Sequence, residues 1–435
     1  MKVMIVSPYI YEENMVEFTR NKTGFGIMVR NIVDSVGELD DVVLLTRVIT
    51  NEKKEKNYKI LSHTWKQIFL SAKIKDWLVA IISFFENKAT LKDRARRVFY
   101  EMDGGYFRKQ IQMEKPDIIH IHGIGTISKS YIRICEEMKV KYVVTLHGLI
   151  GLNDSISAPE YEKKIERDFL MAAENHNIPV SVISSGMKNR IEKKYLGKKA
   201  SNITIITNGT KRIESTDVNL NDENNALREE VFLEYYNDCL KQNSLYPKIS
   251  DTYSYLVRSK KNGKKILFFV GNITPNKNQI QAVEVLRNKK IFADTILVFW
   301  GREVDGGKVR NKIREYKLQK NVILGGFNER MSEFWNLCDV NVFLSLNDGF
   351  GLSIVEGYMR GIPCVTFEDL DSTEDLYFPE SMIKITERNT ESVTNALQTA
   401  LDKKWNHEKI IEVGNRFSID MMAQKYSNWY KKVIM

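Results

Sequence analysis

One glycine-bearing stretch in the C-terminal half has the residue types needed to bind a phosphate or sugar ligand. Residues 347–357 read NDGFGLSIVEG, so two carboxylates, Asp348 and Glu356, are separated by seven residues. Gly349 and Gly351 lie between them and would let the backbone approach a diphosphate or a sugar closely, because glycine has no side chain. The stretch therefore favours an anion-binding or sugar-binding loop.

The elements around this stretch leave two interpretations open. An apolar run ends at residues 344–345, and a helix is predicted to begin near Leu352. In an open parallel sheet, ligands bind where strands end and helix N-termini offer free N–H groups. Glu356 could then accept hydrogen bonds from a ribose diol. Alternatively, this is a plain strand-to-helix turn in which Glu356 only favours the positive end of the helix dipole.

The pattern of apolar runs predicts an α/β protein with two doubly wound parallel sheets. Runs that are apolar along their whole length are typical of strands covered on both faces, and helical spacing lies between them. The expected strands of the N-terminal half are residues 3–6, 42–45, 118–121, 142–146, 180–183 and 203–206. Those of the C-terminal half are residues 265–270, 295–300, 321–324, 340–344 and 364–367.

Between these halves the composition shifts toward Asn, Asp, Glu and Lys. We therefore expect an N-terminal domain over residues 1–212, a connecting or inserted helical segment over 213–263, and a C-terminal domain over 264–417. A length of 435 residues fits two domains of about 200 residues each.

Composition and charge exclude some classes of protein. The formal net charge of +9 favours anionic partners without selecting one. No nucleic-acid-binding module accompanies that charge, so nucleic-acid binding is not expected. The four cysteines are widely spaced and predict reduced thiols. The first apolar run ends at Ser7 and no run reaches the length of a membrane span, so we expect a cytoplasmic protein.

Residues 60–100 combine aromatic and aliphatic side chains with a basic fringe. This composition suits a helix that lies in a membrane interface, and it predicts peripheral contact with an anionic membrane at the inner face. It also suits an ordinary helical hairpin that packs on its own sheet. The sequence leaves both possibilities open.

Asp348 and Glu356, around Gly-Phe-Gly-Leu, resemble the two-acid motif of retaining glycosyltransferases of family 4 (group 1), which have the GT-B fold of two Rossmann-like domains facing a cleft. The resemblance extends over nearly the whole chain. Further segments similar to the family are residues 24–26, which are expected to form a loop, and residues 116–122, 145–148, 184, 208–209, 270–272, 275–277, 299–301, 322–327 and 416–418. The resemblance also implies that the final helix, residues 418–435, packs back on the N-terminal domain.

The resemblance assigns roles to individual residues. Lys277 would neutralise the diphosphate as the sugar–phosphate bond breaks. Glu356 would hold the ribose, and Asp348 would contact sugar hydroxyls near the reacting carbon. The family usually has Glu at the position of Asp348, and usually pairs the lysine with an arginine where this chain has Asn272. Both departures from the family's pattern fall on residues that the resemblance assigns to donor binding.

The remaining site residues also follow from the resemblance. His147 would lie near the donor sugar and the acceptor, and together with Asp348 and Lys277 it forms the predicted catalytic set. The predicted donor-binding residues are Gly26, Gly271, Asn272, Lys277, Phe327, Gly349, Phe350, Gly351, Leu352 and Glu356.

No metal is expected. His120 and His122 share a strand face but lack a third ligand nearby in sequence, and Asp369-Leu370-Asp371 is too short a match to the metal motif of the other glycosyltransferase fold.

These residues imply a metal-independent, retaining glycosyltransferase of the hexosyl type without a cofactor. Its donor would be a nucleotide-diphosphate sugar, with uridine as the expected base. Its acceptor would be a glycan or lipid-linked hydroxyl in cell-surface polysaccharide or glycoconjugate synthesis. The alternative is a catalytically inactive sugar-nucleotide-binding or scaffold protein of the same fold, which the departures at Asn272 and Asp348 favour.

Overall fold

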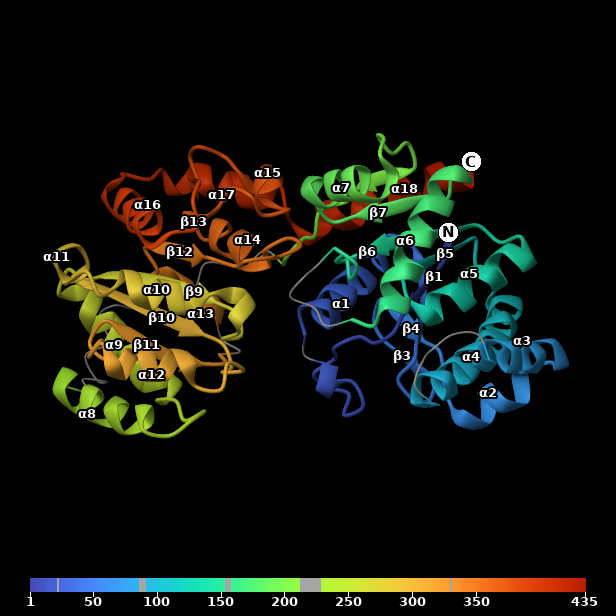
Figure 1. The fold of residues 1–435 in the computed structure, drawn as a ribbon, viewed down its shortest axis with the longest axis horizontal. Helices are drawn as coiled ribbons and strands as arrows, with labels where there is room; N and C mark the ends of the chain where they lie inside the picture. The colour runs from blue at the N-terminus through green and yellow to red at the C-terminus, as the bar shows by residue number, and fades with distance from the viewer. Residues whose placement is uncertain (22, 86–90, 153–157, 212–227, 329–330) are drawn as a thin grey trace. The chain divides into compact units, whose positions relative to one another are not determined.

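The computed structural model describes residues 1–21, 23–85, 91–152, 158–211, 228–328 and 331–435, which form two compact units. The first unit consists of Met1–Gly209 and Ile419–Met435, and the second of Thr210–Ser418. Each unit has a largely parallel sheet with helices on both faces (Figure 1). This arrangement confirms the predicted fold class of two doubly wound α/β domains.

The sheet of the first unit has eight strands, and its order reverses between β1 and β5. Only β3 and β4 pair antiparallel; every other neighbouring pair is parallel. Along the sheet the strands are β3 (Lys53–Lys54), β4 (Tyr58–Ile60), β2 (Asp41–Thr46), β1 (Lys2–Ser7), β5 (Ile118–His122), β6 (Tyr142–Leu146), β7 (Val180–Val182) and β8 (Ile203–Ile205). The side chains of β5 are all buried, as expected of a strand covered on both faces.

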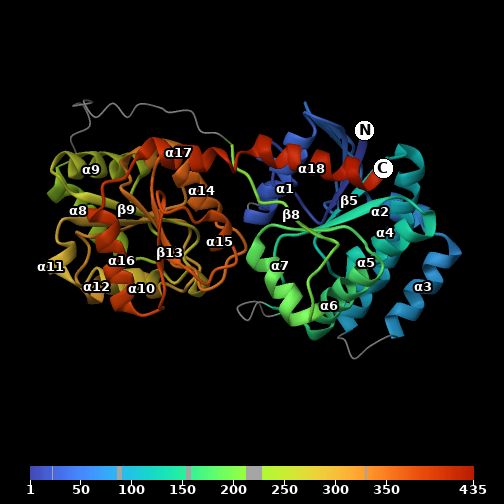
Figure 2. The same ribbon diagram turned by 90° about the horizontal axis from the view of Figure 1, so that it is seen from above.

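The helices of the first unit come from both ends of the chain. They are η1 (Thr19–Asn21), α1 (Gly24–Val36), α2 (Trp65–Ser71), α3 (Ile74–Phe85), α4 (Leu91–Glu114), α5 (Thr126–Met138), α6 (Glu160–Asn175), α7 (Ser185–Ile191), η2 (Glu192–Leu196) and α18 (Ile419–Ile434). The last helix, drawn in red, lies beside α1 (Figure 2). Its Tyr430 hydroxyl is 2.6 Å from Nδ1 of His120 on β5, so the C-terminus completes the core of the first unit.

The sheet of the second unit is parallel throughout, and its order reverses between β9 and β12. Its strands are, in order, β11 (Val322–Gly326), β10 (Thr295–Trp300), β9 (Lys265–Val270), β12 (Val340–Phe343), β13 (Cys364–Phe367) and β14 (Met382–Ile385). The helices are α8 (Glu229–Leu240), α9 (Ile249–Lys261), η4 (Pro275–Lys277), α10 (Gln279–Val285), α11 (Lys289–Phe292), α12 (Lys308–Glu315), α13 (Met331–Phe334), η5 (Trp335–Leu337), α14 (Leu352–Tyr358), α15 (Thr373–Leu376), α16 (Thr390–Asp402) and α17 (His407–Asn415).

Helices α8 and α9, which fall in the segment expected to connect the domains, belong to the second unit. The Tyr236 hydroxyl on α8 donates to the carbonyl of Val322 at 3.0 Å and accepts from the N–H of Leu324 at 2.9 Å. It thereby satisfies backbone groups at the open edge of β11. On α9, Tyr255 stacks on Phe232 of α8 with ring centroids 4.3 Å apart.

Some local expectations differ from the structure. Residues 24–26, expected as a loop, form the first turn of α1, because the Thr23 side chain accepts a hydrogen bond from the Gly26 N–H at 3.1 Å and caps the helix. The sequence did not indicate β3, β4 or β14, which are short and contain lysine. All four cysteines are free and buried. No helix in the described part of the chain is long and apolar enough to cross a bilayer.

Candidate active site

The point where the strand order reverses in the second unit brings two distant segments together. Strands β9 and β12 are neighbours, and the chain leaves the carboxyl end of each into a separate turn. The turn after β9 leads to Lys277, and the turn after β12 leads to Asp348. This edge of a doubly wound sheet is where ligands bind. The carbonyl of Asn276 accepts from the N–H of Leu346 at 2.7 Å, and its side-chain amide donates to the carbonyl of Asn347 at 2.7 Å, so the turns are joined directly.

Contacts with nearby residues hold the Lys277 side chain across this edge of the second sheet. Thr274 caps the short helix η4 by accepting from the N–H of Lys277 at 3.3 Å. The ammonium group lies 4.6 Å from the ring centroid of Phe343 and forms an ion pair with Asp348. A Cβ on Gly271 would make only an ordinary contact of 3.6 Å with the lysine Cε, so the side chain passes close over the end of β9, and it is the φ of +144° that favours glycine at this position. Lys277 therefore lies at the switch point with its charge only partly exposed.

Asp348 uses both carboxylate oxygens. Oδ2 pairs with Lys277, while Oδ1 accepts hydrogen bonds from the N–H groups of Phe350 and Gly351 at 3.2 and 3.0 Å. Gly351 has φ +77° and stands at the N-cap of α14, a left-handed conformation that glycine adopts without strain. The Asp348 carboxylate thus pairs with the lysine and with two of the N–H groups before α14.

Glu356 lies on α14 and is partly buried. Burial raises the pKa of its carboxyl group to about 7, because removing a carboxylate from water disfavours its charged form. Within the described residues, no hydrogen bond or ion pair involves this carboxyl group. A partly buried carboxyl group without a partner can accept hydrogen bonds from a ligand.

The turns after β9 and β10 pack against each other without side chains between them. A Cβ on Gly301 would lie 2.2 Å from the carbonyl oxygen of Gly271. Asn272, which stands where the family usually has arginine, accepts from the backbone N–H of Arg302 at 3.1 Å. Its side chain therefore fixes the geometry of the two turns and carries no charge. The guanidinium of Arg302 lies 5.2 Å from the ring centroid of Phe327, which follows β11 and is 38% exposed.

In the first unit, three histidines form a row: His120 and His122 are buried on β5, and His147, which is partly buried, directly follows β6. Nε2 of His147 is 2.8 Å from Nδ1 of His122, and the His120 and His122 ring centroids are 4.0 Å apart. Burial lowers the pKa of His147 to about 4 and that of His122 well below its ordinary value, so both rings are neutral near pH 7. Nδ1 of His147 is buried and has no partner among the described residues.

His147 also faces the first turn of α1. The ring of Phe25 meets it edge-on at 5.2 Å between centroids, next to Gly26, whose carbonyl accepts from the N–H of Tyr11 at 3.1 Å. A cavity of about 330 Å³ lies alongside, at the switch point between β1 and β5. Its lining includes Phe25, Arg47, His122 and Glu162. This cavity can accept a polar ligand at the carboxyl edge of the first sheet.

Two family models of known glycosyltransferases match the chain, one in each half. "Glycosyl transferases group 1" matches residues 257–416, and "Glycosyltransferase Family 4" matches residues 89–211. The chain belongs to the family 4 glycosyltransferases.

Curated relatives match parts of this family 4 chain. The poly(glycerol-phosphate) alpha-glucosyltransferase of Bacillus subtilis (strain 168) is 26% identical over 160 residues, which cover 36% of this chain and 23% of that protein. The O-antigen biosynthesis glycosyltransferase WclY of Escherichia coli is 24% identical over 172 residues, covering 37% and 45%. The chain thus spans less than half the length of these two relatives.

Solved structures match the family 4 chain over its whole length. A glycosyltransferase from Rickettsia africae ESF-5 superposes with a TM-score of 0.66 at 14% identity, covering 100% of this chain and 98% of that one. Anabaena Alr3699/HepE, in complex with UDP and glucose, superposes with a TM-score of 0.58 at 13% identity, covering 99% and 100%. At these identities the likeness shows the GT-B fold.

The residues predicted for this family 4 site fall into two groups. The second unit brings together Lys277 and Asp348, the loop with Gly349, Phe350, Gly351 and Leu352, and the turn with Gly271 and Asn272. Glu356 lies one turn further along α14, and Phe327 lies at the end of β11. His147 and Gly26 lie together in the first unit.

Sequence reasoning missed Arg388, which stabilises the end of β12. Its guanidinium pairs with both oxygens of Asp369, at 3.0 and 2.6 Å, and donates to the carbonyls of Ser345 and Leu346 at 3.3 Å each. No motif pointed to this arginine, since its partners lie 19 to 43 residues away in sequence. Asp369, part of the rejected Asp-x-Asp match, thus has a structural partner. Within the described residues, no cluster of three metal-ligating side chains occurs.

Proposed function

We propose that this chain is a retaining glycosyltransferase of the hexosyl type, which moves a sugar from a UDP-sugar to a hydroxyl of a glycan or lipid-linked acceptor. The observation that carries the proposal is the meeting of Lys277, Asp348 and the N-terminus of α14 at the β9–β12 switch point. A cation beside the N–H groups at the start of a helix favours a diphosphate, which would compete with Asp348 for them. The complex of the similar Anabaena protein with UDP supports uridine as the base.

In the proposed reaction, the bond between the sugar C1 and the diphosphate oxygen breaks first. Lys277 and the N-terminus of α14 stabilise the negative charge on the departing diphosphate. The acceptor oxygen then forms a new bond to C1 on the same face, and its proton passes to the diphosphate or solvent. Glu356 would accept hydrogen bonds from the ribose diol, and Asp348 would turn from Lys277 to the sugar hydroxyls.

The acceptor is proposed from the chemistry of the relatives and of the surface. The names of the curated relatives refer to a glycerol-phosphate polymer and an O-antigen, which supports cell-surface polysaccharide or glycoconjugate synthesis. We place the reaction in the cytoplasm, with peripheral contact to the inner face of the membrane through residues 60–100. Metal independence and the absence of a cofactor belong to the same proposal.

A thermal-shift screen without added metal tests the donor class. Purified protein is compared with UDP, GDP, ADP and CMP, each at millimolar concentration. Selective stabilisation by UDP, lost in Glu356→Ala, is the expected result, because a ligand that binds only the folded state raises its stability. Unchanged stabilisation in the presence of EDTA is expected as well. Stabilisation by UDP without sugar transfer to any acceptor would favour the inactive sugar-nucleotide-binding alternative, and no stabilisation by any nucleotide would refute the proposed donor site.

A further inference from the structure

Helix α3 of the first unit has its polar and apolar faces reversed. Its large side chains point to solvent and are between 41% and 82% exposed: Ile74, Trp77, Leu78, Ile81, Ile82 and Phe85. Among the α3 side chains that the structure describes, those of Asp76 and Ala80 are fully buried. A surface helix of a globular protein normally buries its apolar stripe and exposes its charges. An exposed patch of this kind marks an interaction surface.

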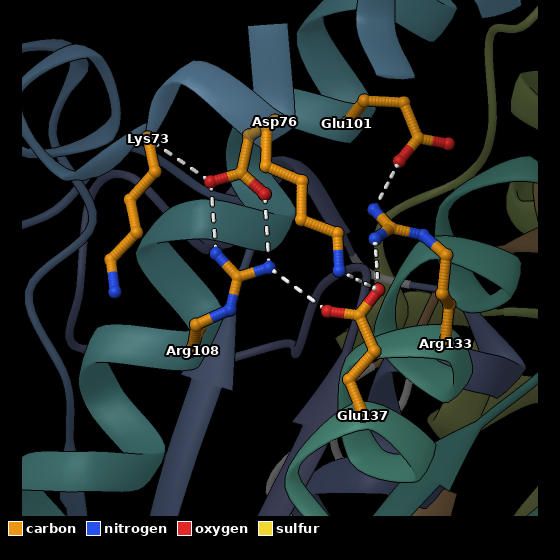
Figure 3. A network of polar contacts seen from close by, with 7 residues as sticks. Lys73, Asp76, Glu101, Arg108, Arg133 and Glu137 are labelled. Carbon is orange, nitrogen blue, oxygen red and sulfur yellow. Dashed lines mark hydrogen bonds and ion pairs between the residues drawn. The ribbon is translucent and has the colours of Figure 1, made fainter. Parts of the chain in front are cut away.

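An ionic network attaches the polar face of α3 to the protein (Figure 3). Both oxygens of Asp76 accept from Arg108 on α4, at 2.9 and 3.0 Å, and Asp76 also accepts from the backbone N–H of Lys73 at 2.9 Å. Arg108 also contacts Glu137 on α5 at 3.4 Å. The large apolar side chains are not needed for this attachment.

The network continues along α5 and stays tightly packed. Glu137 pairs with Lys75 at 3.0 Å and with Arg133 at 2.8 Å, and Arg133 pairs with Glu101 on α4 at 2.7 Å (Figure 3). Close approach adds to this, since a Cβ on Gly105 would lie 2.8 Å from the Asp76 carboxylate and 2.9 Å from the Cα of Ala72. Because charges and a glycine hold α3 in place, its orientation is fixed with the apolar face outward.

Helix α2 extends the same surface. Thr64 and Gln67 form a capping box that fixes its first turn, and Ile68 is fully buried as its anchor. Trp65, Phe69 and Leu70 are at least half exposed. Aromatic side chains beside aliphatic ones are typical of helices that lie at the boundary between headgroups and acyl chains.

The charges on this surface have one sign. Lys66 and Lys73 are exposed, Lys75 is exposed but pairs with Glu137, and the only acidic residue of segment 62–85 is Asp76, which is buried. Lysine attracts anionic headgroups. A second copy of the chain docked on the same face would instead bring like charges together around a twofold axis. Charge therefore favours an anionic lipid surface as the occupant.

We infer that α2 and α3 form the docking surface for a bilayer that contains anionic lipid, with the apolar side chains at the acyl boundary and the lysines among the headgroups. The inference specifies the membrane contact of the proposed function. The role of docking in catalysis rests on the proposed function, whereas the docking itself does not. Docking would place the first unit next to an acceptor that is anchored in the bilayer.

Flotation of the full-length protein with vesicles tests the inference. Vesicles of phosphatidylcholine alone are compared with vesicles that also contain phosphatidylglycerol, at low and high salt. We expect binding to the anionic vesicles that weakens with salt, and a loss of affinity of about tenfold or more in Ile81→Glu/Ile82→Glu. Lys66→Gln/Lys73→Gln should lose about fivefold per lysine on anionic vesicles.

The matched control is Val231→Glu/Val304→Glu, which places two carboxylates at exposed valines of the second unit. Its vesicle binding should equal that of the unaltered protein, and thermal unfolding should show that all variants fold. Equal loss in the control, or no binding of the unaltered protein to anionic vesicles at low salt, would overturn the inference. The inference would also be overturned if the unaltered protein forms a dimer but binds no vesicles, and Ile81→Glu/Ile82→Glu dissociates that dimer.

The UDP screen separates the two proposals. Stabilisation by UDP with no vesicle binding would refute docking alone. Vesicle binding with no nucleotide stabilisation would refute the donor site alone.

Discussion

The Asp348 carboxylate pairs with the Lys277 ammonium across the carboxyl edge of the second sheet, although 71 residues separate them in sequence. Through its other oxygen, Asp348 accepts from the N–H groups of Phe350 and Gly351. This side chain supplies to Lys277 the negative charge that we propose a diphosphate supplies during catalysis. A donor would then have to displace an internal carboxylate.

Lys277→Ala should reduce kcat/KM for sugar transfer about 10²- to 10³-fold, because one charge that stabilises the leaving group is lost. The initial rate of UDP release, measured with acceptor present, checks this. Lys404→Ala, at an exposed lysine of the same unit, provides the control and should keep full activity. Equal activity of the two variants would remove Lys277 from the proposed mechanism.

Asp348→Asn should separate nucleotide binding from transfer. The substitution removes the negative charge that competes for Lys277, so UDP should bind at least as tightly as before. Transfer should fall, because the sugar hydroxyls lose their carboxylate partner. Isothermal titration with UDP and an assay of transfer measure the two effects. Weaker UDP binding in this variant would contradict the idea of an internal competitor.

Glu356 predicts how UDP binding depends on pH. Its pKa of about 7 in the free chain means that the carboxyl group changes charge near neutral pH. Hydrogen bonds from a diol favour the carboxylate, so UDP affinity should rise as the pH increases through 7 and level off above it. Because UDP itself titrates in this range, the profile is compared with that of Glu356→Gln. Identical profiles would contradict the assignment.

The same pKa has a consequence for stability. A carboxyl group whose folded pKa lies above its unfolded value binds more protons in the folded state, so its contribution destabilises the protein as the pH rises from about 4.5 to 7. Glu356→Gln removes this penalty. Its thermal unfolding temperature should exceed that of the unaltered protein above pH 7, and the difference should shrink toward pH 5.

His147→Ala should reduce transfer while leaving UDP-induced stabilisation unchanged, since the residue lies in the first unit and is proposed to contact the sugar and the acceptor. A ring with a pKa of about 4 stays neutral above pH 6, so its loss should not alter the pH profile in that range. His176→Ala, at an exposed histidine of the same unit, is the control. Unchanged transfer in His147→Ala would exclude its proposed role.

Much of the fold could be predicted because its strands are buried on both faces. Tyr142–Leu146 and Lys265–Val270 were located from runs that are mostly apolar along their whole length. Strands β4 and β14 were missed, since Lys59 and Lys384 interrupt runs of only three and four residues. The two carboxylates of the donor loop were found because their spacing is local. The Lys277–Asp348 pair depends on the switch between β9 and β12, which no local pattern shows.

The orientation of α3 could not be predicted from its sequence either. Its apolar residues fit a buried hairpin as well as a membrane surface. The orientation of α3 is set by the ion pair of Asp76 with Arg108, which lies 32 residues away on another helix. The glycines of the first turn of α1 favoured a loop. The side chain of Thr23, which precedes them, caps the helix and sets its start.

The contact between His120 and Tyr430 affects how the protein can fold during synthesis. These residues are 310 positions apart, and all of Thr210–Ser418 is made between the two parts of the first unit. At ribosomal speeds of 5–20 residues per second, that interval lasts roughly 10 to 40 s. During this interval the surface of the first unit on which α18 packs stays uncovered. We therefore expect the nascent N-terminal half to depend most on chaperones. Removing a few C-terminal residues should destabilise the first unit, although that unit is synthesised first.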